Sequence, residues 1–177
     1  MYKFLRLINN KIVSGYNQDF IWEVGKSYKV KGKLSMCSNG FHCSQMPLDA
    51  LRYVAGEILA EVEVSGKSIK EKNKQCWQEM RLVKAYNWTK KDSVALAIYS
   101  AELVLDNFEK LYPDDKRPRQ AIQATKKVLK NDTEKNRSAE SAWSAESAWS
   151  AAIEEINNKI NTWIINHIKK LKPLIIN

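Results

Sequence analysis

The sequence of 177 residues contains little cysteine, glycine and proline, with 3, 6 and 4 residues respectively. An odd number of cysteines does not fit the disulfide framework of a small secreted protein. No apolar run approaches the ~20 residues that a membrane-spanning helix needs. The first residues carry charge and no small-residue cleavage site, so we expect no signal peptide. These absences predict a protein of a reducing cytoplasm that does not enter a membrane.

The sequence does contain enough apolar residues for a core, since 44% are hydrophobic and 10% are aromatic. Wholesale disorder is therefore excluded. The net charge is +9. Residues 1–88 hold 14 Lys and Arg against 8 Asp and Glu, and residues 89–177 hold 15 against 12. A basic excess suits contact with nucleic acid or another acidic surface, but a base composition that favours Lys, Asn and Ile would also produce it.

The first half has the pattern of short strands joined by turns. Asn39-Gly40 is typical of a turn, and Pro47 suits the first turn of a short helix that ends before Gly56. Residues 58–64 alternate apolar and acidic side chains, as in a half-buried strand. We therefore predict an α+β domain over residues 1–88, with a small mixed or antiparallel sheet and one short helix. Its clearest elements are strands at Tyr2–Ile8, Phe41–Ser44 and Ile58–Val64 and a helix at Leu48–Val54.

The second half has the pattern of helices, with apolar residues three and four apart. Pro113 helps to end the first helix and Pro118 lies at the start of the second. The sequence predicts helices at 92–112, 117–131 and 134–172, the last with a potential break near 152–158. We therefore predict an all-helical domain of three to four helices over residues 89–177.

The last predicted helix contains the unit SAESAW twice in succession, at residues 138–149. Six residues of α-helix turn through about 600°, so Trp143 and Trp149 would lie about 120° apart, which excludes a heptad coiled coil. Small residues on the remaining surface would let another backbone approach closely. We expect a helix packed among its neighbours, with one tryptophan in the core and the other available to a partner or dimer mate. A solvated stalk is the alternative.

Two stretches resemble known families. CSNGFHCSQMPLDALRYV, with the later VEVSG, is similar to an uncharacterised domain of phage and prophage proteins. The matching residues are Gly40, Phe41, His42, Pro47, Leu48, Asp49, Val62, Glu63 and Gly66. FEKLYPDDKRPRQAI resembles the helical hairpin of an immunity protein family, through Phe108, Glu109, Tyr112, Pro113, Asp115, Arg117, Pro118, Arg119, Ala121 and Ile122. The resemblances imply a phage or mobile-element context and a fold, but no reaction.

Several residues of the first half are candidates for chemistry. His42 beside Phe41 is a candidate binding residue or general base, but without a partner at a recognisable spacing a structural role fits better. Cys37, Cys43 and Cys76 with His42 could hold zinc, although the spacing is unusual and adjacent residues of a strand face opposite ways. Buried free thiols are the simpler interpretation. A faint similarity to NAD-dependent ADP-ribosyltransferases lacks the expected order of catalytic residues.

Two basic groups are candidate binding residues. Lys26, Lys29, Lys31 and Lys33 surround Tyr28 and could grip a phosphate backbone, or could form a solvated strand edge. Arg117 and Arg119 follow two aspartates in the hairpin, where charge-assisted hydrogen bonds within the hairpin are expected more than contact with a partner.

We therefore predict a non-enzymatic binding protein without catalytic residues, metal or cofactor. It would act in the cytoplasm of a bacterial host, as a phage or mobile-element protein that inhibits a bacterial protein or ribonucleoprotein. A CRISPR nuclease complex is the leading candidate. The alternatives are an immunity protein that neutralises a toxin and a basic RNA- or DNA-binding accessory protein. The chain would be a monomer or a homodimer joined through its C-terminal helices.

Overall fold

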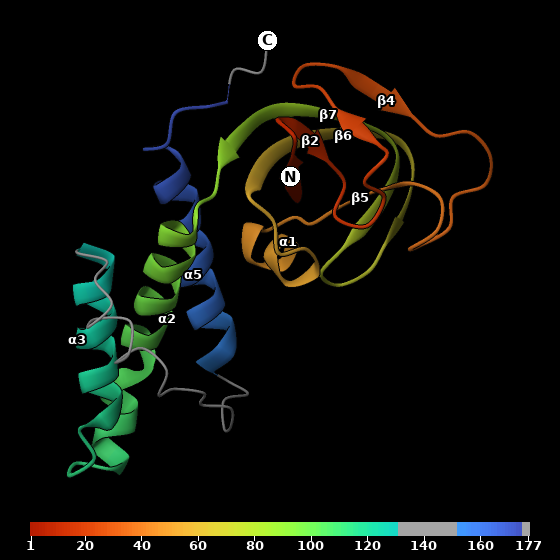
Figure 1. The fold of residues 1–177 in the computed structure, drawn as a ribbon. Coiled ribbons are helices and arrows are strands. Elements are labelled where there is room, and N and C mark those ends of the chain that lie inside the picture. The colour runs from red at the N-terminus through yellow and green to blue at the C-terminus, as the bar shows by residue number, and fades with distance from the viewer. Residues whose placement is uncertain (131–151, 175–177) are drawn as a thin grey trace. The chain divides into compact units, whose positions relative to one another are not determined.

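The structure is a computed structural model that describes residues 1–130 and 152–174 (Figure 1). Its strands are β1 (Tyr2–Ile8), β2 (Lys11–Val13), β3 (Ile21–Trp22), β4 (Ser27–Lys29), β5 (Phe41–Cys43), β6 (Ile58–Lys70) and β7 (Gln75–Asn87). Its helices are α1 (Pro47–Tyr53), α2 (Lys90–Leu111), α3 (Arg117–Lys130) and α5 (Ala152–Ile168). Contacts divide the chain into a sheet unit, Met1–Trp88 with Ile164–Asn177, and a helical unit, Thr89–Trp163.

The sheet unit contains one antiparallel sheet. Six of its seven strands follow the order β3-β2-β1-β6-β7-β4, and the seventh, β5, pairs with β7. All pairs between these strands are antiparallel. The α+β class predicted from the sequence is confirmed. The prediction of a small sheet was wrong, because the sheet has seven strands and two of them, β6 and β7, are 13 residues long.

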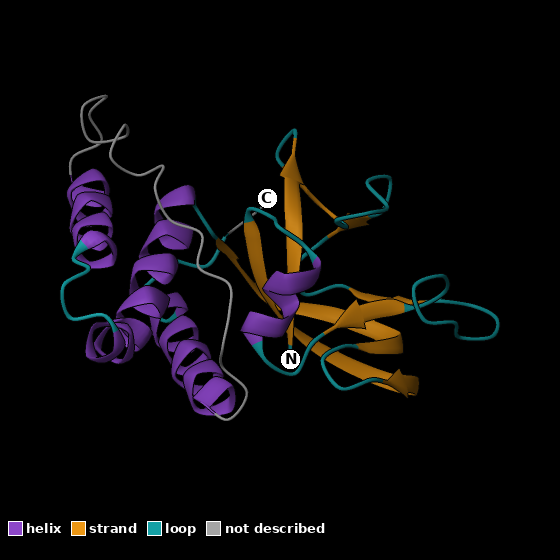
Figure 2. Ribbon diagram, turned by 90° about the horizontal axis from the view of Figure 1, so that it is seen from below, coloured by secondary structure: helices purple, strands orange, loops and turns teal. Residues whose placement is uncertain are grey.

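The sheet curls because its long strands are irregular. The register of β6 on β7 shifts between Glu61 and Val62 and again between Ser65 and Ser68. Such bulges bend a strand and increase its twist, and the curvature of β6 and β7 is visible in Figures 1 and 2. An antiparallel bridge joins Tyr2 in β1 to Ser44, directly after β5. The chain of strand neighbours β1, β6, β7 and β5 therefore returns to β1.

The sheet unit contains one main core of buried residues. This core comprises Leu5, Ile12, Trp22, Phe41, Cys43, Ile58, Ala60, Val62, Met80, Leu82 and Ala85. At one end, the rings of Phe20, Trp22, Tyr28 and Phe41 pack with centroid distances from 4.9 to 5.6 Å. Offset and edge-to-face packing of this kind adds to the stability gained from burial alone.

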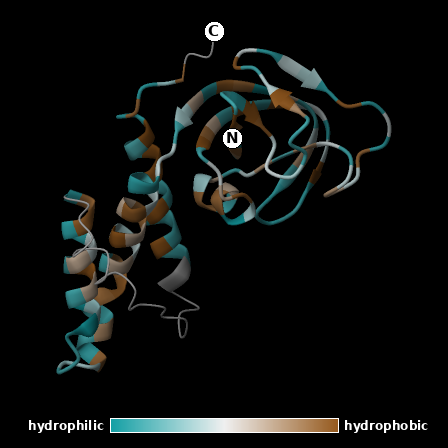
Figure 3. Cartoon of the chain, viewed as in Figure 1, coloured by the Kyte–Doolittle hydropathy of each residue, from teal (hydrophilic) through white to brown (hydrophobic). Residues whose placement is uncertain are grey.

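The helical unit begins with a capping box. The Thr89 hydroxyl accepts a hydrogen bond from the Asp92 backbone N–H, and the Asp92 carboxylate accepts one from the Thr89 N–H. Such a pair satisfies two backbone donors that a helix start leaves free. Helices α2 and α3 then pack through Ile98, Ala101, Leu105 and Ile122. Polar and apolar residues alternate around both helices (Figure 3).

The last predicted helix is described only in part. Helix α5 covers residues 152–168 of the predicted range 134–172. The SAESAW repeat, with Trp143 and Trp149, lies outside the described residues. Within α5, Trp163 stacks on Tyr99 of α2 with a centroid distance of 5.7 Å. No helix within residues 1–130 and 152–174 combines the length and apolar character needed to span a lipid bilayer.

Candidate functional site in the sheet unit

The segment before β5 is a tight turn that Gly40 makes possible. Ser35 and Asn39 exchange two backbone hydrogen bonds of 2.9 Å. Gly40 has a φ of +140°, and a Cβ there would lie 2.2 Å from the Cys76 sulfur. The turn leads into β5, which pairs with β7 and buries Phe41 and Cys43 while His42 faces the other way. The turn lies at residues 36–38, just before the predicted position at Asn39-Gly40, and the opposite orientation of His42 and Cys43 is confirmed.

His42 fixes this turn through its ring. Its Nε2 accepts a hydrogen bond of 2.9 Å from the backbone N–H of Cys37, whose φ is +63°. Burial lowers the pKa of His42, and the charges of Lys3 and Lys74 lower it further. A neutral ring whose Nε2 accepts a hydrogen bond carries its proton on Nδ1. The lone pair that a general base would use is therefore engaged, which favours the structural role for His42.

The three cysteines have different surroundings. Cys43 and Cys76 are buried and Cys37 is exposed. Burial raises the pKa of the Cys43 thiol to about 11 and also raises the pKa of Cys76. The Cys37 sulfur lies 3.2 Å from Lys74 Nζ. Among the described residues, no three His, Cys, Asp or Glu side chains gather as metal ligands would. Thiols that stay protonated are poor zinc ligands.

A cavity of about 670 Å³ opens beside Phe41 and His42. Its walls come from β1, the segment after β2, the turn before β5, and helix α1. Lys3 lies on this wall, where its Nζ donates a hydrogen bond of 2.6 Å to the His42 carbonyl oxygen. The Lys3 ammonium also lies 5.6 Å from the centre of the Trp22 ring. The cavity therefore joins a cation to an aromatic cluster.

Desolvation changes the acidity of Lys3. It lowers the pKa of the ammonium to about 8, well below the ordinary value for lysine. No carboxylate within the described residues lies at ion-pair distance from it. Titratable groups with a strongly shifted pKa cluster at functional sites, so Lys3 is a candidate for one. Lys3 is the candidate residue that the sequence analysis missed.

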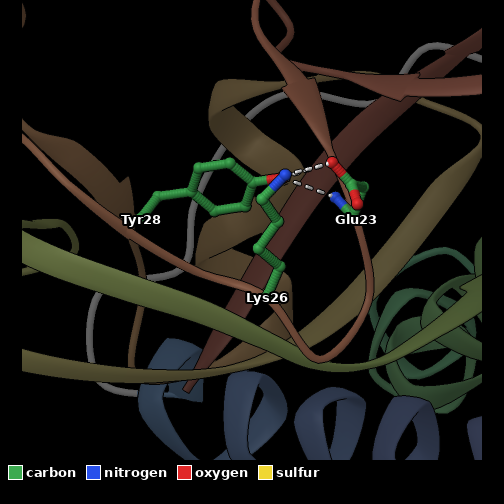
Figure 4. A network of polar contacts seen from close by, with 3 residues as sticks. All are labelled: Glu23, Lys26 and Tyr28. Carbon is green, nitrogen blue, oxygen red and sulfur yellow. Dashed lines mark hydrogen bonds and ion pairs between the residues drawn. The ribbon is translucent and has the colours of Figure 1, made fainter.

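The four lysines predicted to bind a phosphate backbone have different surroundings. Lys26 pairs with Glu23, with 2.6 Å between Nζ and Oε1, and Lys29 pairs with Glu79 at the same distance. Figure 4 shows Tyr28 beside the first pair, where its hydroxyl accepts a hydrogen bond from the Glu23 backbone N–H. Lys31 and Lys33 form no ion pair with any of the described residues. Half of the predicted positive charge is therefore compensated locally.

The hairpin arginines form ion pairs inside the helical unit. Arg119 makes two hydrogen bonds of 2.6 Å to the Glu109 carboxylate. Arg117 pairs with Asp115 and holds the pKa of that carboxyl at about 2. These contacts agree with the structural role expected for both arginines. The Arg117 side chain is nevertheless 88% exposed, so it also remains accessible.

An exposed apolar cluster lies at the same turn between α2 and α3. Leu111 is 73% exposed and Tyr112 is 57% exposed, the first at the end of α2 and the second directly after it. The ring of Tyr112 packs against Phe108 with a centroid distance of 5.0 Å. We call Phe108, Leu111 and Tyr112 the hairpin-tip cluster.

A comparison with protein-family models finds a match for the sheet unit. The family model described as "Domain of unknown function (DUF7666)" matches residues 3–92. The chain belongs to this family. The DUF7666 match contains β2 to β7, α1, all of β1 except Tyr2, and every cavity residue except Tyr2. Neither the search of curated proteins nor the search of solved structures found a match.

Proposed function

We propose that this DUF7666 protein is a non-enzymatic binding protein that inhibits a bacterial partner by occupying its surface. The setting we propose is a phage or other mobile element, and the motif resemblances of both halves support it. The binding surface we propose is the hairpin-tip cluster. The observation that carries the proposal is the exposure of Leu111 and Tyr112 at one turn, at 73% and 57%.

The composition of this turn suits a protein interface. Single exposed apolar residues are common on protein surfaces, but adjacent ones beside a half-buried ring form a patch. Tyrosine and arginine are the residues that most often dominate binding energy, and a polar rim around an apolar centre excludes water. Here Arg117 and the Arg119–Glu109 pair supply polar groups close in sequence to the cluster. The partner surface that fits is an apolar depression edged by carboxylates.

A binding and inhibition experiment tests the proposal. Purified chain is mixed with an assembled CRISPR nuclease complex, and both complex formation and target DNA cleavage are measured. We expect binding and inhibition by the natural sequence, and a loss of about tenfold or more in affinity for the double variant Leu111→Ala, Tyr112→Ala. Val24→Ala with Ile69→Ala removes two exposed apolar residues of the sheet unit and serves as the matched control.

The outcomes separate the parts of the proposal. Binding of a toxin in place of the nuclease complex, with the same loss in the double variant, would replace the partner and keep the surface. Equal affinities for the double variant and its control would show that the hairpin-tip cluster is not the binding surface. A chain that neither binds nor inhibits either class of partner would refute the inhibitor function.

Nucleic-acid binding is a second candidate, favoured by the unpaired side chains of Lys31 and Lys33. Changing both to Glu should abolish retention on RNA and DNA and flatten the salt dependence of binding. Lys26→Glu with Lys29→Glu is the comparison, because these two lysines are already paired with carboxylates. Natural protein that fails to bind RNA or DNA at low salt would remove this candidate.

A further inference from the structure

Lys3 occupies a position of β1 that faces the core. Side chains alternate along a strand, so Met1, Lys3, Leu5 and Leu7 share one face. Leu5 is fully buried in the sheet core, and Met1 and Leu7 pack against it. Lysine is rarely buried unless it is paired. A lysine in this row is therefore an exception that packing alone does not explain.

The ammonium of Lys3 has unused hydrogen-bonding capacity. An ammonium carries three N–H donors. The His42 carbonyl oxygen, at 2.6 Å, is the acceptor that the described residues provide. The face of the Trp22 ring stabilises positive charge but accepts no strong hydrogen bond. Two donors thus remain for a group that enters the cavity.

The cavity around Lys3 is positive in sign. Its lining contains two lysines and a histidine but no aspartate or glutamate, although the chain has 20 acidic residues. The second lysine, Lys74, is engaged by Glu71 at 3.5 Å and by the Cys37 sulfur at 3.2 Å. Lys3 is therefore the cation that an incoming anion would meet without displacing an ion pair.

The remaining wall is aromatic. The cavity is lined by Tyr16, Phe20, Trp22, Phe41 and Tyr53, and its volume of about 670 Å³ lies within the range of pockets that hold small organic ligands. Phe20 is half-buried, whereas Tyr16 and Tyr53 are exposed. The Tyr16 hydroxyl donates a hydrogen bond of 3.1 Å to the Tyr53 carbonyl oxygen, which joins the two segments that carry these rings. Such walls favour a flat ring over an inorganic ion.

We propose that this cavity is a binding site for a small organic anion on a planar ring, with the anionic group on Lys3 and the ring against Phe20 and the two tyrosines. Nucleoside monophosphates and aromatic carboxylates share this chemistry. The site lies within the DUF7666 match and is independent of the hairpin-tip cluster. It gives the sheet unit a ligand of its own.

Binding is measured on the full chain with four probes, by thermal shift and by calorimetry. AMP and indole-3-acetate carry both a ring and an anion, adenosine carries only the ring, and inorganic phosphate carries only the anion. We expect at least one of the first two to bind, and adenosine and phosphate to bind about tenfold more weakly or not at all. AMP and indole-3-acetate then distinguish the two sources of the anion.

Lys3→Met tests the cation, and Lys84→Met, an exposed lysine on β7, is the matched control. We expect Lys3→Met to weaken binding about tenfold or more and Lys84→Met to leave it unchanged. Circular dichroism reports whether each variant is folded. Equal losses in both variants, equal binding by Lys3→Met, or no binding of any probe by the natural sequence would each overturn the proposal.

A pH series provides a test without substitution. Indole-3-acetate stays ionised above pH 6, so its binding should weaken as pH rises through 8 and Lys3 loses its proton. The charged or titratable groups around Lys3 are His42, Lys74, Cys43 and Cys76. Burial lowers the pKa of His42 and raises those of Cys43 and Cys76, which moves the titration of these three groups away from pH 8. The same pH series on Lys3→Met separates the effect of Lys3 from that of the exposed Cys37 thiol, which also lines the cavity. Binding that does not change between pH 7 and 9 would contradict the assignment.

Discussion

Both units of this protein carry ion pairs at the surface, but the sheet unit also holds a lysine ammonium beside its core. The sheet unit holds the ammonium of Lys3 against its core, with a backbone carbonyl as its protein acceptor. The ion pairs of the helical unit, such as Arg119–Glu109 and Lys126–Glu102, lie on its surface. Surface pairs contribute little to stability, whereas a charge held away from water changes its pKa. The sheet unit can therefore bind a ligand by charge inside a cavity, whereas these two ion pairs of the helical unit are available only at its surface.

The units also differ in how far apart in the sequence their packed segments lie. In the sheet unit, three contacts join segments more than 30 residues apart in sequence. These are the pairing of β1 with β6, the pairing of β5 with β7, and the bridge between Tyr2 and Ser44. Helices α2 and α3 are consecutive and pack across a short turn. A substitution in the sheet core should therefore disturb distant segments, and one in the helical unit should act locally. The following predictions test this difference, beginning with the largest effect.

Leu82→Ala should have the largest effect, because Leu82 is fully buried on β7. Loss of its side chain leaves a cavity and should lower the free energy of unfolding by about 2–5 kcal/mol. Hydrogen exchange should show faster exchange in β1, β6 and β7. Leu105→Ala, in the core of the helical unit, should instead act on α2 and α3. If either variant speeds hydrogen exchange equally in both units, the chain unfolds as one cooperative body.

Gly56→Ala should have the next largest effect. A Cβ at this position would lie 2.1 Å from the Leu5 carbonyl oxygen, a backbone atom of β1 that cannot move without the strand. We expect a loss of about 1–3 kcal/mol in chemical denaturation. Gly25 is the control, because it has a φ of +87° but nothing within 4 Å of a new Cβ. A larger loss for Gly25→Ala than for Gly56→Ala would show that backbone conformation outweighs the close approach.

Lys3→Met should change the pH dependence of stability, by an amount limited by the partial exposure of Lys3. The folded chain releases the Lys3 proton near pH 8, while the unfolded chain keeps it to about 10.5. Between these values the unfolded state binds more protons, so the contribution of Lys3 to stability rises with pH. Lys3→Met should be more stable than the natural sequence at pH 7, and this advantage should shrink towards pH 10.

Denaturant midpoints of both proteins across pH 7–10 measure this effect. The pKa of the Cys43 thiol, raised to about 11, makes stability fall above pH 9 in both proteins, so the difference between them is the useful quantity. A difference that is constant with pH would show that Lys3 is solvated like a surface lysine.

Thr89→Ala should have the smallest of these effects, about 1 kcal/mol, because it removes one half of the capping box of α2. Its exchange signature should be confined to the first turn of α2. Arg119→Ala removes an exposed pair from the same unit and should shift the melting temperature by less. If Arg119→Ala proves the more harmful of the two, the hairpin pair supports more structure than its exposure indicates.

The elements that the sequence predicts are those whose pattern is local. Alternation at Ile58–Val64, the turn at Asn39-Gly40 and the proline at the start of α1 each indicate structure within a few residues. Strand β7 escaped detection because its buried residues do not keep one alternation. Met80 and Leu82 are two residues apart, but beyond the register shift opposite Glu61 and Val62 the adjacent residues Ala85 and Tyr86 are both buried. The second half of β6 escaped because its side chains are exposed and show no alternation.

The cavity was predictable only in part. Phe41 and His42 stand out in the sequence, and both line it. Lys3 does not, because YKFLRLI is apolar on both faces and nothing in the sequence says which face turns inward. The contrast between Lys29 and Lys31 was equally hidden, since Lys29 meets Glu79 only through the pairing of β4 with β7. Features that depend on distant pairing require the fold to be known.

The strand order has a consequence for the synthesis of this protein. Strand β1 leaves the ribosome before its partner β6, which begins at residue 58, and the Leu174 N–H, which follows the helical unit in the chain, donates a hydrogen bond to the carbonyl oxygen of Ala85 in β7. Distant pairing slows folding, and an unpaired strand can meet other chains while it waits. Helices α2 and α3 are consecutive and pack directly on each other. The sheet unit is therefore completed only after residues that follow the helical unit have been made, and the β6 edge of β1 has no partner until residue 58 and beyond have been made.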